Sequence, residues 1–200
     1  AVIPVGVPGG YYGDSLWMNK AIERLYLPAL RLLLEDVIDI NLPPEGVARH
    51  LALVRIHKRF TGQAHKVLYG LWGLGQLALV KGVVVVDHDV DVQQPQAVIR
   101  RVLDAVDWAR DVIIVDGPLD AVDRSGPLPG FGGKIGLDAT QTTRQTAEPP
   151  PLDTAALDTL TGGQWTVWQG RVIVASAGST PPQEALSRLA EYCPGFHVVL

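Results

Sequence analysis

Residues 41–92 read NLPPEGVARHLALVRIHKRFTGQAHKVLYGLWGLGQLALVKGVVVVDHDVDV, and this stretch decides the fold. Its pattern predicts a strand at residues 51–57, a helix at 61–80 and a second strand at 82–87. This order is typical of a right-handed crossover that joins two parallel strands. Because the second strand holds four consecutive valines without polar alternation, we expect both of its faces to be covered. The predicted fold class is α/β, a layered α/β/α domain with a mainly parallel sheet built from βαβ units.

The composition restricts the classes of protein to consider. The chain has 200 residues, of which 47% are hydrophobic and 19% are charged, enough for one buried core and a small additional lobe. A net charge of −4 without a basic run argues against binding to nucleic acid or to an anionic membrane. No apolar run reaches the roughly 18 residues of a membrane span. The single cysteine, Cys193, excludes an internal disulfide, fits a cytoplasmic location and is interpreted as a packing residue.

The residues before the central stretch predict two strands and a long helix. Residues 1–8 form an apolar run interrupted by prolines, which indicates an edge strand. Since the chain opens within that run, we expect it to be part of a longer protein. Pro28 lies inside the helical pattern that follows Asp14 and is expected to kink or split the helix, and residues 37–41 are a candidate strand. The predicted buried face of the helix consists of Met18, Ile22, Leu25, Ala29 and Leu32.

The residues after the central stretch predict further α/β structure. A helix is expected near residues 96–105 and a buried strand at 112–115. Residues 117–136 are rich in glycine and proline, which favours a long loop, and such loops often carry function. We place a domain boundary at residue 140. Residues 141–200 are then a connector and a β-α-β unit, which either extends the same sheet or forms a small lobe.

Asp87, Asp89 and Asp91 form the most conspicuous polar cluster. They follow a buried strand, where α/β sheets place their ligand sites. Asp89 and Asp91 are two residues apart and could hold a divalent cation, as in a metal-dependent transferase. The structural alternative is that these carboxylates accept hydrogen bonds from loop and helix amides.

Asp14 and Lys134 are two further candidates. Asp14 precedes a helical pattern, so on the local sequence alone it is interpreted as a helix N-cap. Lys134 is a single cation among several glycines, a combination that suits an anion, although the segment lacks the spacing of a Walker A motif. The five histidines show neither metal-ligand spacing nor a recognisable catalytic triad.

Three glycines interrupt the predicted helix at residues 61–80. Gly70, Gly73 and Gly75 each cost about 1 kcal/mol of helix stability relative to alanine. Three glycines so close together indicate that another backbone approaches the helix unusually closely. The approach could come from packing within the subunit or from a subunit interface, and the sequence leaves both open.

Several long motifs together resemble one known family. NLPPEGVARHLALVRIHKRFTGQAHKVLYGLWGLGQ, then VVVVDHDVDV and GGKIGLDAT, resemble the C-terminal domain of the UbiD family of flavin-dependent decarboxylases. AIERLYLP at residues 21–28 makes the menaquinone-biosynthesis type the most similar one. The resemblance covers roughly residues 1–140, with the motifs in the same order, and does not extend to residues 141–200.

The resemblance implies a chemistry and a set of partners. Members of the family are carboxy-lyases that act on aromatic or α,β-unsaturated acids with prenylated FMN, together with Mn²⁺ and K⁺. The flavin and metal ligands lie mainly in an upstream domain, which this chain does not include. The family's catalytic acid, usually glutamate, falls on Asp14, and a lysine that reaches the cofactor falls on Lys134. The resemblance also implies a homo-oligomer, with the helix of Gly70 near a dimer interface.

Three hypotheses follow from the sequence. The first is the C-terminal domain of a prenylated-FMN-dependent decarboxylase, inactive alone, in which Asp14 protonates the product carbon. The second is a non-catalytic oligomerisation domain. The third is a metal-dependent transferase built on Asp87, Asp89 and Asp91, which the resemblance disfavours because the family's metal site lies elsewhere.

Overall fold

The computed structural model describes residues 11–46, 50–121, 123, 125–140, 151–168, 170–176 and 180–199, with side chains from Trp17 onward. The chain divides into two compact units, Ala1–Thr142 and Thr143–Leu200. The edge strand predicted for residues 1–8 lies outside the described residues. No helix in the described part of the chain combines the length and the apolar character that crossing a membrane requires.

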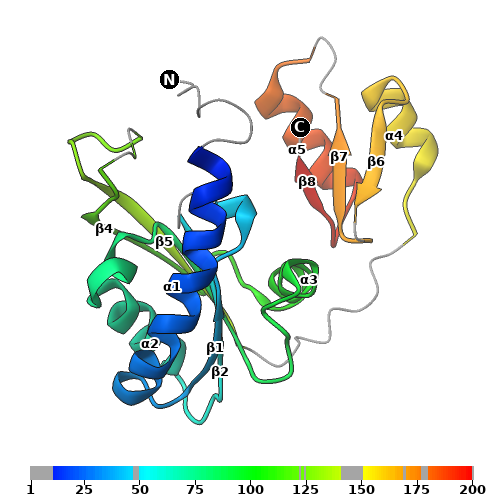
Figure 1. Ribbon diagram of the computed structural model, residues 1–200. Coiled ribbons are helices and arrows are strands. Elements are labelled where there is room, and N and C mark those ends of the chain that lie inside the picture. The colour runs from blue at the N-terminus through cyan, green and yellow to red at the C-terminus, as the bar shows by residue number, and fades with distance from the viewer. Residues whose placement is uncertain are drawn as a thin grey trace. The chain divides into compact units, whose positions relative to one another are not determined.

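The first unit contains a five-stranded sheet with the order β1-β2-β3-β5-β4 (Figure 1). The predicted α/β class is confirmed, and the central stretch forms the predicted crossover, because β2 pairs with β3 in parallel. β3 also pairs with β5 in parallel, whereas the edge strands β1 and β4 pair antiparallel with their neighbours. The strands are β1 Val37–Asn41, β2 Leu51–Ile56, β3 Gly82–Val86, β4 Val112–Pro118 and β5 Phe131–Ala139.

Helices cover both faces of this sheet (Figure 1). Val83 and Val85 of β3 belong to one buried cluster, with residues of α1 and α2. Val84 and Val86 belong to a second cluster, with residues of α3. The expectation that the valine strand is covered on both faces is therefore confirmed. The helical elements are α1 Tyr11–Leu33, η1 Pro44–Gly46, α2 Gln63–Trp72, η2 Gly75–Leu79 and α3 Pro95–Ala105.

Helix α1 turns a different face toward the sheet from the predicted one. Met18, Leu25 and Leu32 are exposed, and α1 continues through Pro28 without splitting. The predicted face was wrong because the polar side chains of Asn19 and Glu23 are buried, and Glu23 accepts a hydrogen bond from the backbone N–H of Leu42. The buried face of the helix and the turn after it consists of Asn19, Glu23, Leu27, Leu30 and Leu34.

Helix α2 is shorter than the predicted helix at residues 61–80. It ends at Trp72 and is followed by η2, which starts at Gly75 with φ of +45°. The N-cap is Gly62, with φ of +84°. Packing within the subunit explains Gly70, because a Cβ there would lie 2.7 Å from Cδ2 of Leu34.

The glycine-rich segment is not a continuous loop. Residues 131–139 form β5, which pairs antiparallel with β4 along its length. The loop predicted for residues 117–136 is therefore wrong at both ends, since residues 117–118 belong to β4 and residues 131–136 belong to β5. The lack of a side chain at Gly136 leaves room for Leu68, since a Cβ on Gly136 would lie 2.9 Å from both δ carbons of Leu68.

The second unit has a three-stranded sheet with the order β6-β7-β8. Helix α5 connects β7 to β8, which pair in parallel, and β6, which was not predicted, pairs antiparallel with β7. Cys193 is buried in this unit's core, and burial raises the pKa of its thiol. The elements are α4 Thr154–Thr161, β6 Trp165–Trp168, β7 Val172–Ala175, α5 Pro182–Tyr192 and β8 His197–Val199.

Candidate functional site

Lys134 lies inside β5 rather than in a loop. The residue is 2% exposed, and its Nζ donates hydrogen bonds to the carbonyl oxygens of Ala78 and, at 3.1 Å, of Val80. Gly117 on β4 leaves room for its aliphatic stem, because a Cβ there would lie 2.9 Å from Cε of Lys134. The strand therefore points the amine at the end of η2, away from solvent.

Burial lowers the pKa of Lys134 to about 8. Removal from water disfavours an ammonium ion, and carbonyl dipoles compensate for only part of the lost hydration. The same Val80 oxygen also accepts a 3.1 Å hydrogen bond from Nε1 of Trp72. The site can therefore hold a cation or a neutral amine near physiological pH, fixed between a strand and a helical turn.

The N-terminal edge of the parallel strands is where Lys134 lies. The next residue, Ile135, pairs with Gly82, the first residue of β3. The N-terminal part of α1 lies toward the same edge, because Glu23 contacts Leu42 just after the end of β1, whereas Leu34 contacts the start of β1 at the opposite edge. β1 and β5 are separated by two strands, which corresponds to about 14 Å across the sheet.

Asp14 lies in the first turns of α1, which includes Tyr11. The helix therefore begins before Asp14, and the N-cap interpretation is wrong. Asp14 precedes Glu23 by nine residues, which places its backbone about 13 Å further along the helix axis. The N-terminal end of α1 thus extends beyond the edge of the sheet where Lys134 lies, and the side chain of Asp14 lies outside the described part of the structure.

The Asp87 cluster lies at the opposite, C-terminal edge of the parallel strands. Asp87 accepts hydrogen bonds from the backbone N–H groups of Lys58, at 3.1 Å, and of His88, at 2.7 Å. Burial acts to raise the pKa of Asp87, but these hydrogen bonds outweigh it and hold the pKa below its ordinary value.

The other two carboxylates of that cluster have separate partners. Asp89 forms a 2.5 Å ion pair with Arg101, which lowers the pKa of Asp89, and Asp91 accepts a hydrogen bond from the backbone of Gln93. These contacts support the structural interpretation of the cluster. Among the described residues, no group of three or more histidine, cysteine, aspartate or glutamate side chains is arranged to hold a metal ion.

A buried network around Glu23 was not predicted. The Glu23 carboxylate accepts hydrogen bonds from Lys20, at 2.9 Å, from Arg24 and from the backbone N–H of Leu42. Lys20 also donates to Asn41 at 2.6 Å, which links α1 to β1 a second time. The sequence signal was the charged run of Lys20, Glu23 and Arg24.

A second ion pair holds the irregular connection between β4 and β5. Lys81, just before β3, contacts Asp123 at 3.2 Å, and Asp123 also accepts hydrogen bonds from Ser125. Burial acts to raise the pKa of Asp123, but the bonds from Ser125 and Lys81 prevail and lower it to about 2. The connection is therefore fastened to the edge of the sheet where Lys134 lies.

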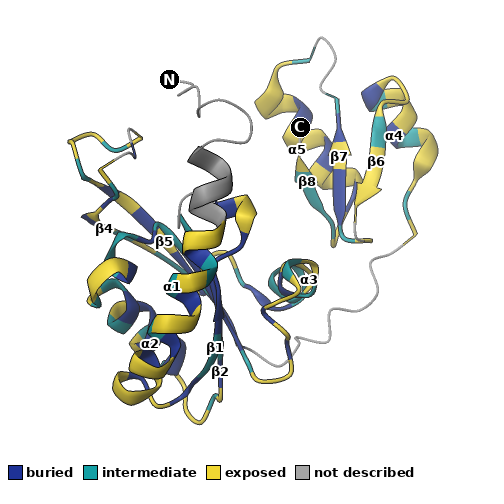
Figure 2. Cartoon of the chain, viewed as in Figure 1, coloured by how far each residue is buried: buried dark blue, intermediate teal, exposed yellow. Residues whose placement is uncertain are grey.

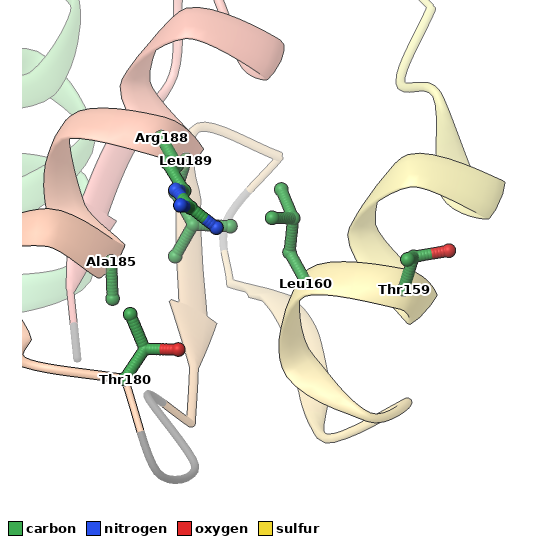
Figure 3. A pocket seen from close by; sticks show the side chains of 6 residues that line it. All are labelled: Thr159, Leu160, Thr180, Ala185, Arg188 and Leu189. Atoms are coloured by element: carbon green, nitrogen blue, oxygen red, sulfur yellow. The ribbon is translucent and has the colours of Figure 1, made fainter.

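The second unit contains a cavity of about 190 Å³ between α4 and α5 (Figure 3). Two of its polar groups already have partners, because Arg188 pairs with Glu184 at 2.6 Å and the Thr159 hydroxyl donates to the carbonyl of Ala155. We therefore assign no ligand to it. Its lining consists of Thr159, Leu160, Thr180, Ala185, Arg188 and Leu189.

Comparison with known proteins identifies similar sequences for most of the first unit. The family model of the 3-octaprenyl-4-hydroxybenzoate carboxy-lyase C-terminal domain matches residues 16–139. An uncharacterised protein of Archaeoglobus fulgidus is 47% identical over 132 residues, which cover 66% of this chain and 27% of that protein. An uncharacterised protein of Aeropyrum pernix is 44% identical over 140 residues, which cover 66% of this chain and 29% of that protein. The chain thus spans less than a third of the length of these relatives.

Similar proteins are also found among the solved structures. The UbiD-class enzyme HmfF of Pelotomaculum thermopropionicum, in complex with FMN, is 29% identical with a TM-score of 0.58, covering 69% of this chain and 31% of that one. The vanillic acid decarboxylase of Sedimentibacter hydroxybenzoicus, in closed form, is 25% identical with a TM-score of 0.53, covering 62% and 26%. The 3,4-dihydroxybenzoic acid decarboxylase of Klebsiella pneumoniae is 15% identical with a TM-score of 0.57, covering 66% and 29%, and shows likeness of fold alone.

Proposed function

The chain belongs to the UbiD family of carboxy-lyases, and on that premise we propose that it is the C-terminal domain of a decarboxylase that uses prenylated FMN. The proposed substrate is an aromatic or α,β-unsaturated carboxylic acid. The family match over residues 16–139 carries the proposal. Structures of the similar enzyme HmfF contain FMN and, in an evolved dimeric form, prenylated FMN. The whole enzyme is proposed to be a cytoplasmic homo-oligomer, with Mn²⁺ and K⁺ held mainly by its upstream domain.

Asp14 is the proposed acid that protonates the product carbon. A proton donor must reach the reacting carbon and must hold its proton near the working pH. The N-terminal end of α1 opposes this, because the helix dipole favours the ionised carboxylate. Burial beside the substrate must therefore raise the pKa of Asp14 in the complete pocket. Because aspartate is one methylene shorter than the usual glutamate, α1 must also lie closer to the reacting carbon.

Lys134 is the proposed contact to the cofactor. Ala78 and Val80 each accept a hydrogen bond from its Nζ, and an ammonium group has three N–H donors. We assign the third donor to a phosphate or flavin oxygen, which requires that the buried amine become accessible to the cofactor in the complete enzyme. The cofactor, when bound, supplies the electron sink for cleavage of the carboxylate carbon bond. Lys134 would then hold positive charge at a fixed point and position the cofactor.

The test uses the longer protein that contains this chain, supplied with prenylated FMN and a panel of aromatic acids. Release of CO₂ by the wild type supports the proposal. Asp14→Asn should abolish turnover and leave flavin binding unchanged, and Asp14→Glu, which restores the family's usual acid, should keep activity. Turnover in Asp14→Asn equal to that of the wild type would remove Asp14 from the mechanism.

A non-catalytic oligomerisation domain remains the second candidate. This candidate is favoured by the large apolar side chains that α1 exposes to solvent. Among them, Leu25 is 74% exposed and Leu32 is 85% exposed. A longer protein that forms a stable oligomer, binds no flavin and releases no CO₂ would support this candidate over the first.

A further inference from the structure

The side of α1 that packs on the sheet is held by apolar packing and by directional polar contacts. Along the described part of α1 this side is buried and the opposite side is exposed (Figure 2). Burial of Leu27 and Leu30 favours close contact with the sheet, but the hydrophobic effect is non-directional and resists small rolls of the helix weakly. Hydrogen bonds weaken steeply when they are misaligned. The polar contacts therefore fix the rotation of α1 about its own axis.

Asn41, the last residue of β1, joins α1 to a second element. Its Oδ1 accepts a 2.6 Å hydrogen bond from Nζ of Lys20, and its Nδ2 donates one of 2.6 Å to the carbonyl oxygen of Val92. Lys20 also pairs with Glu23 at 2.9 Å, and Glu23 accepts the hydrogen bond from the backbone N–H of Leu42. We call the side chains of Lys20, Glu23 and Asn41 the clamp. The clamp connects α1, the end of β1 and the loop that follows β3.

The loop at residues 87–94, between β3 and α3, is itself fastened on both sides. The Asp87 carboxylate accepts hydrogen bonds from two backbone N–H groups, and Asp89 pairs with Arg101 of α3 at 2.5 Å. Val92 is buried within the cluster that α3 covers. The acidic run of this loop thus holds the acceptor for Asn41 in a fixed position.

We propose that Asn41 is a positioning residue for Asp14. Through Lys20 and Glu23 it sets the rotation of α1, and thereby the point at which Asp14 meets the substrate. The inference rests on the proposed function, in which Asp14 protonates the product carbon.

The stiffness of α1 transmits the effect of the clamp to Asp14. No glycine or proline lies between Asp14 and Glu23, so this part of the helix moves as one body. A roll of about 10° moves an atom that lies about 5 Å from the helix axis by about 1 Å. A misplacement of about 1 Å can lower the rate of a reaction by about a hundredfold. The short side chain of aspartate leaves little freedom to compensate for such a roll.

The test measures CO₂ release by the longer protein that contains this chain, supplied with prenylated FMN and an aromatic acid. Asn41→Ala should lower kcat at least about tenfold and leave KM within about twofold of the wild-type value. Asp14→Glu lengthens the acid by one methylene, so a rolled helix can still deliver the proton. In the Asp14→Glu background, Asn41→Ala should therefore lower kcat less than about threefold. The matched control is Val98→Ala, which removes buried methyl groups from α3 on the other face of the sheet and should leave kcat unchanged in both backgrounds.

A second variant keeps the proposal falsifiable if Asn41→Ala does not fold. Lys20→Met removes the same link at a position whose side chain is 37% exposed, and it should show the same dependence on the residue at position 14. A wild-type kcat in the clamp variants, or an equal loss in the two Asp14 backgrounds, would overturn the proposal.

Amide hydrogen exchange of the longer protein separates a failure of the clamp from a failure of the proposed function. Asn41→Ala should speed the exchange of α1 amides at least about tenfold relative to those of α2, whether or not CO₂ is released. Exchange of α1 equal to that of the wild type would refute the clamp. A wild-type protein that releases no CO₂ would refute the proposed function instead.

Discussion

The carboxylate of Glu23 accepts a hydrogen bond of 3.0 Å from the backbone N–H of Leu42 and thereby joins the middle of α1 to the end of β1. Glu23 is 1% exposed, and Lys20 and Arg24 compensate its charge. This contact, together with the burial of Leu27 and Leu30, holds one face of α1 on the sheet and leaves Leu25 and Leu32 toward solvent.

Replacing Glu23 should destabilise the first unit. Glu23→Ala leaves the Leu42 N–H without its acceptor and removes the counter-charge of Lys20, so we expect a loss of about 2–3 kcal/mol in the free energy of unfolding. Urea denaturation measures this loss. Glu35→Ala is the control, because Glu35 is exposed, and it should change stability by less than about 0.5 kcal/mol. Equal effects of the two substitutions would contradict a role for the network.

The buried amine of Lys134 should make stability depend on alkaline pH. Its folded pKa is about 8, below the value of about 10.4 for an unfolded lysine, so the unfolded state binds more protons between these values. The free energy of unfolding should therefore rise with pH in this window. We expect wild type to gain about 2 kcal/mol relative to Lys134→Met between pH 7.5 and pH 10. Urea denaturation at the two pH values is the measurement. Equal changes in the unfolding free energy of the wild type and of Lys134→Met would show that burial does not perturb the pKa of the amine.

The two glycines of β5 that flank Lys134 and Ile135 should respond differently to alanine. At Gly136 a new Cβ would lie 2.9 Å from both δ carbons of Leu68 and 3.1 Å from Cη2 of Trp72. Gly136→Ala should therefore cost about 1–3 kcal/mol through overpacking. At Gly133 the nearest atom would lie 3.9 Å away, so Gly133→Ala should be neutral or slightly stabilising. Thermal unfolding of both variants is the measurement, and a similar loss at Gly133 would contradict the packing explanation.

The Asp123 carboxylate should support stability at neutral pH and lose that role in acid. Its folded pKa of about 2 lies below the unfolded value of about 3.9, so its contribution is complete above pH 4 and disappears as the pH falls through 2. Asp123→Asn should cost about 1–2 kcal/mol at pH 7. The wild-type advantage should shrink at pH 2.5, and an advantage unchanged between the two pH values would refute the assignment.

The local sequence pattern was sufficient to predict the central strand, helix and strand of the fold. The strand, helix and valine strand of residues 41–92 could be predicted because their apolar residues, turns and neighbours all favour the same structure. The buried face of α1 could not, since it contains Glu23 and Asn19, and burial of polar side chains depends on partners such as Leu42 that are distant in sequence. The strand β5 was missed because its glycines favour a loop locally, whereas Leu68 requires the space at Gly136.

The candidate site was predictable in part, and only through resemblance. Nothing local distinguishes Asp14 from a helix cap, and the glycines around Lys134 suggested an anion loop instead of a buried strand position. The network of Lys20 and Glu23 was visible as charges three residues apart but not as a buried cluster. Its burial depends on β1, which the chain reaches only after the helix has ended.

The one-sided packing of α1, which leaves large apolar side chains such as Leu25 and Leu32 exposed, also affects how the 200-residue chain behaves in concentrated solution. Substitutions at Leu25 or Leu32 should hardly change its unfolding free energy, because these side chains are exposed in the folded chain. They should change its colloidal behaviour, since a continuous apolar surface promotes self-association even when the protein is fully folded. A screen for folding stability and a screen for solubility would therefore identify opposite sides of the same helix.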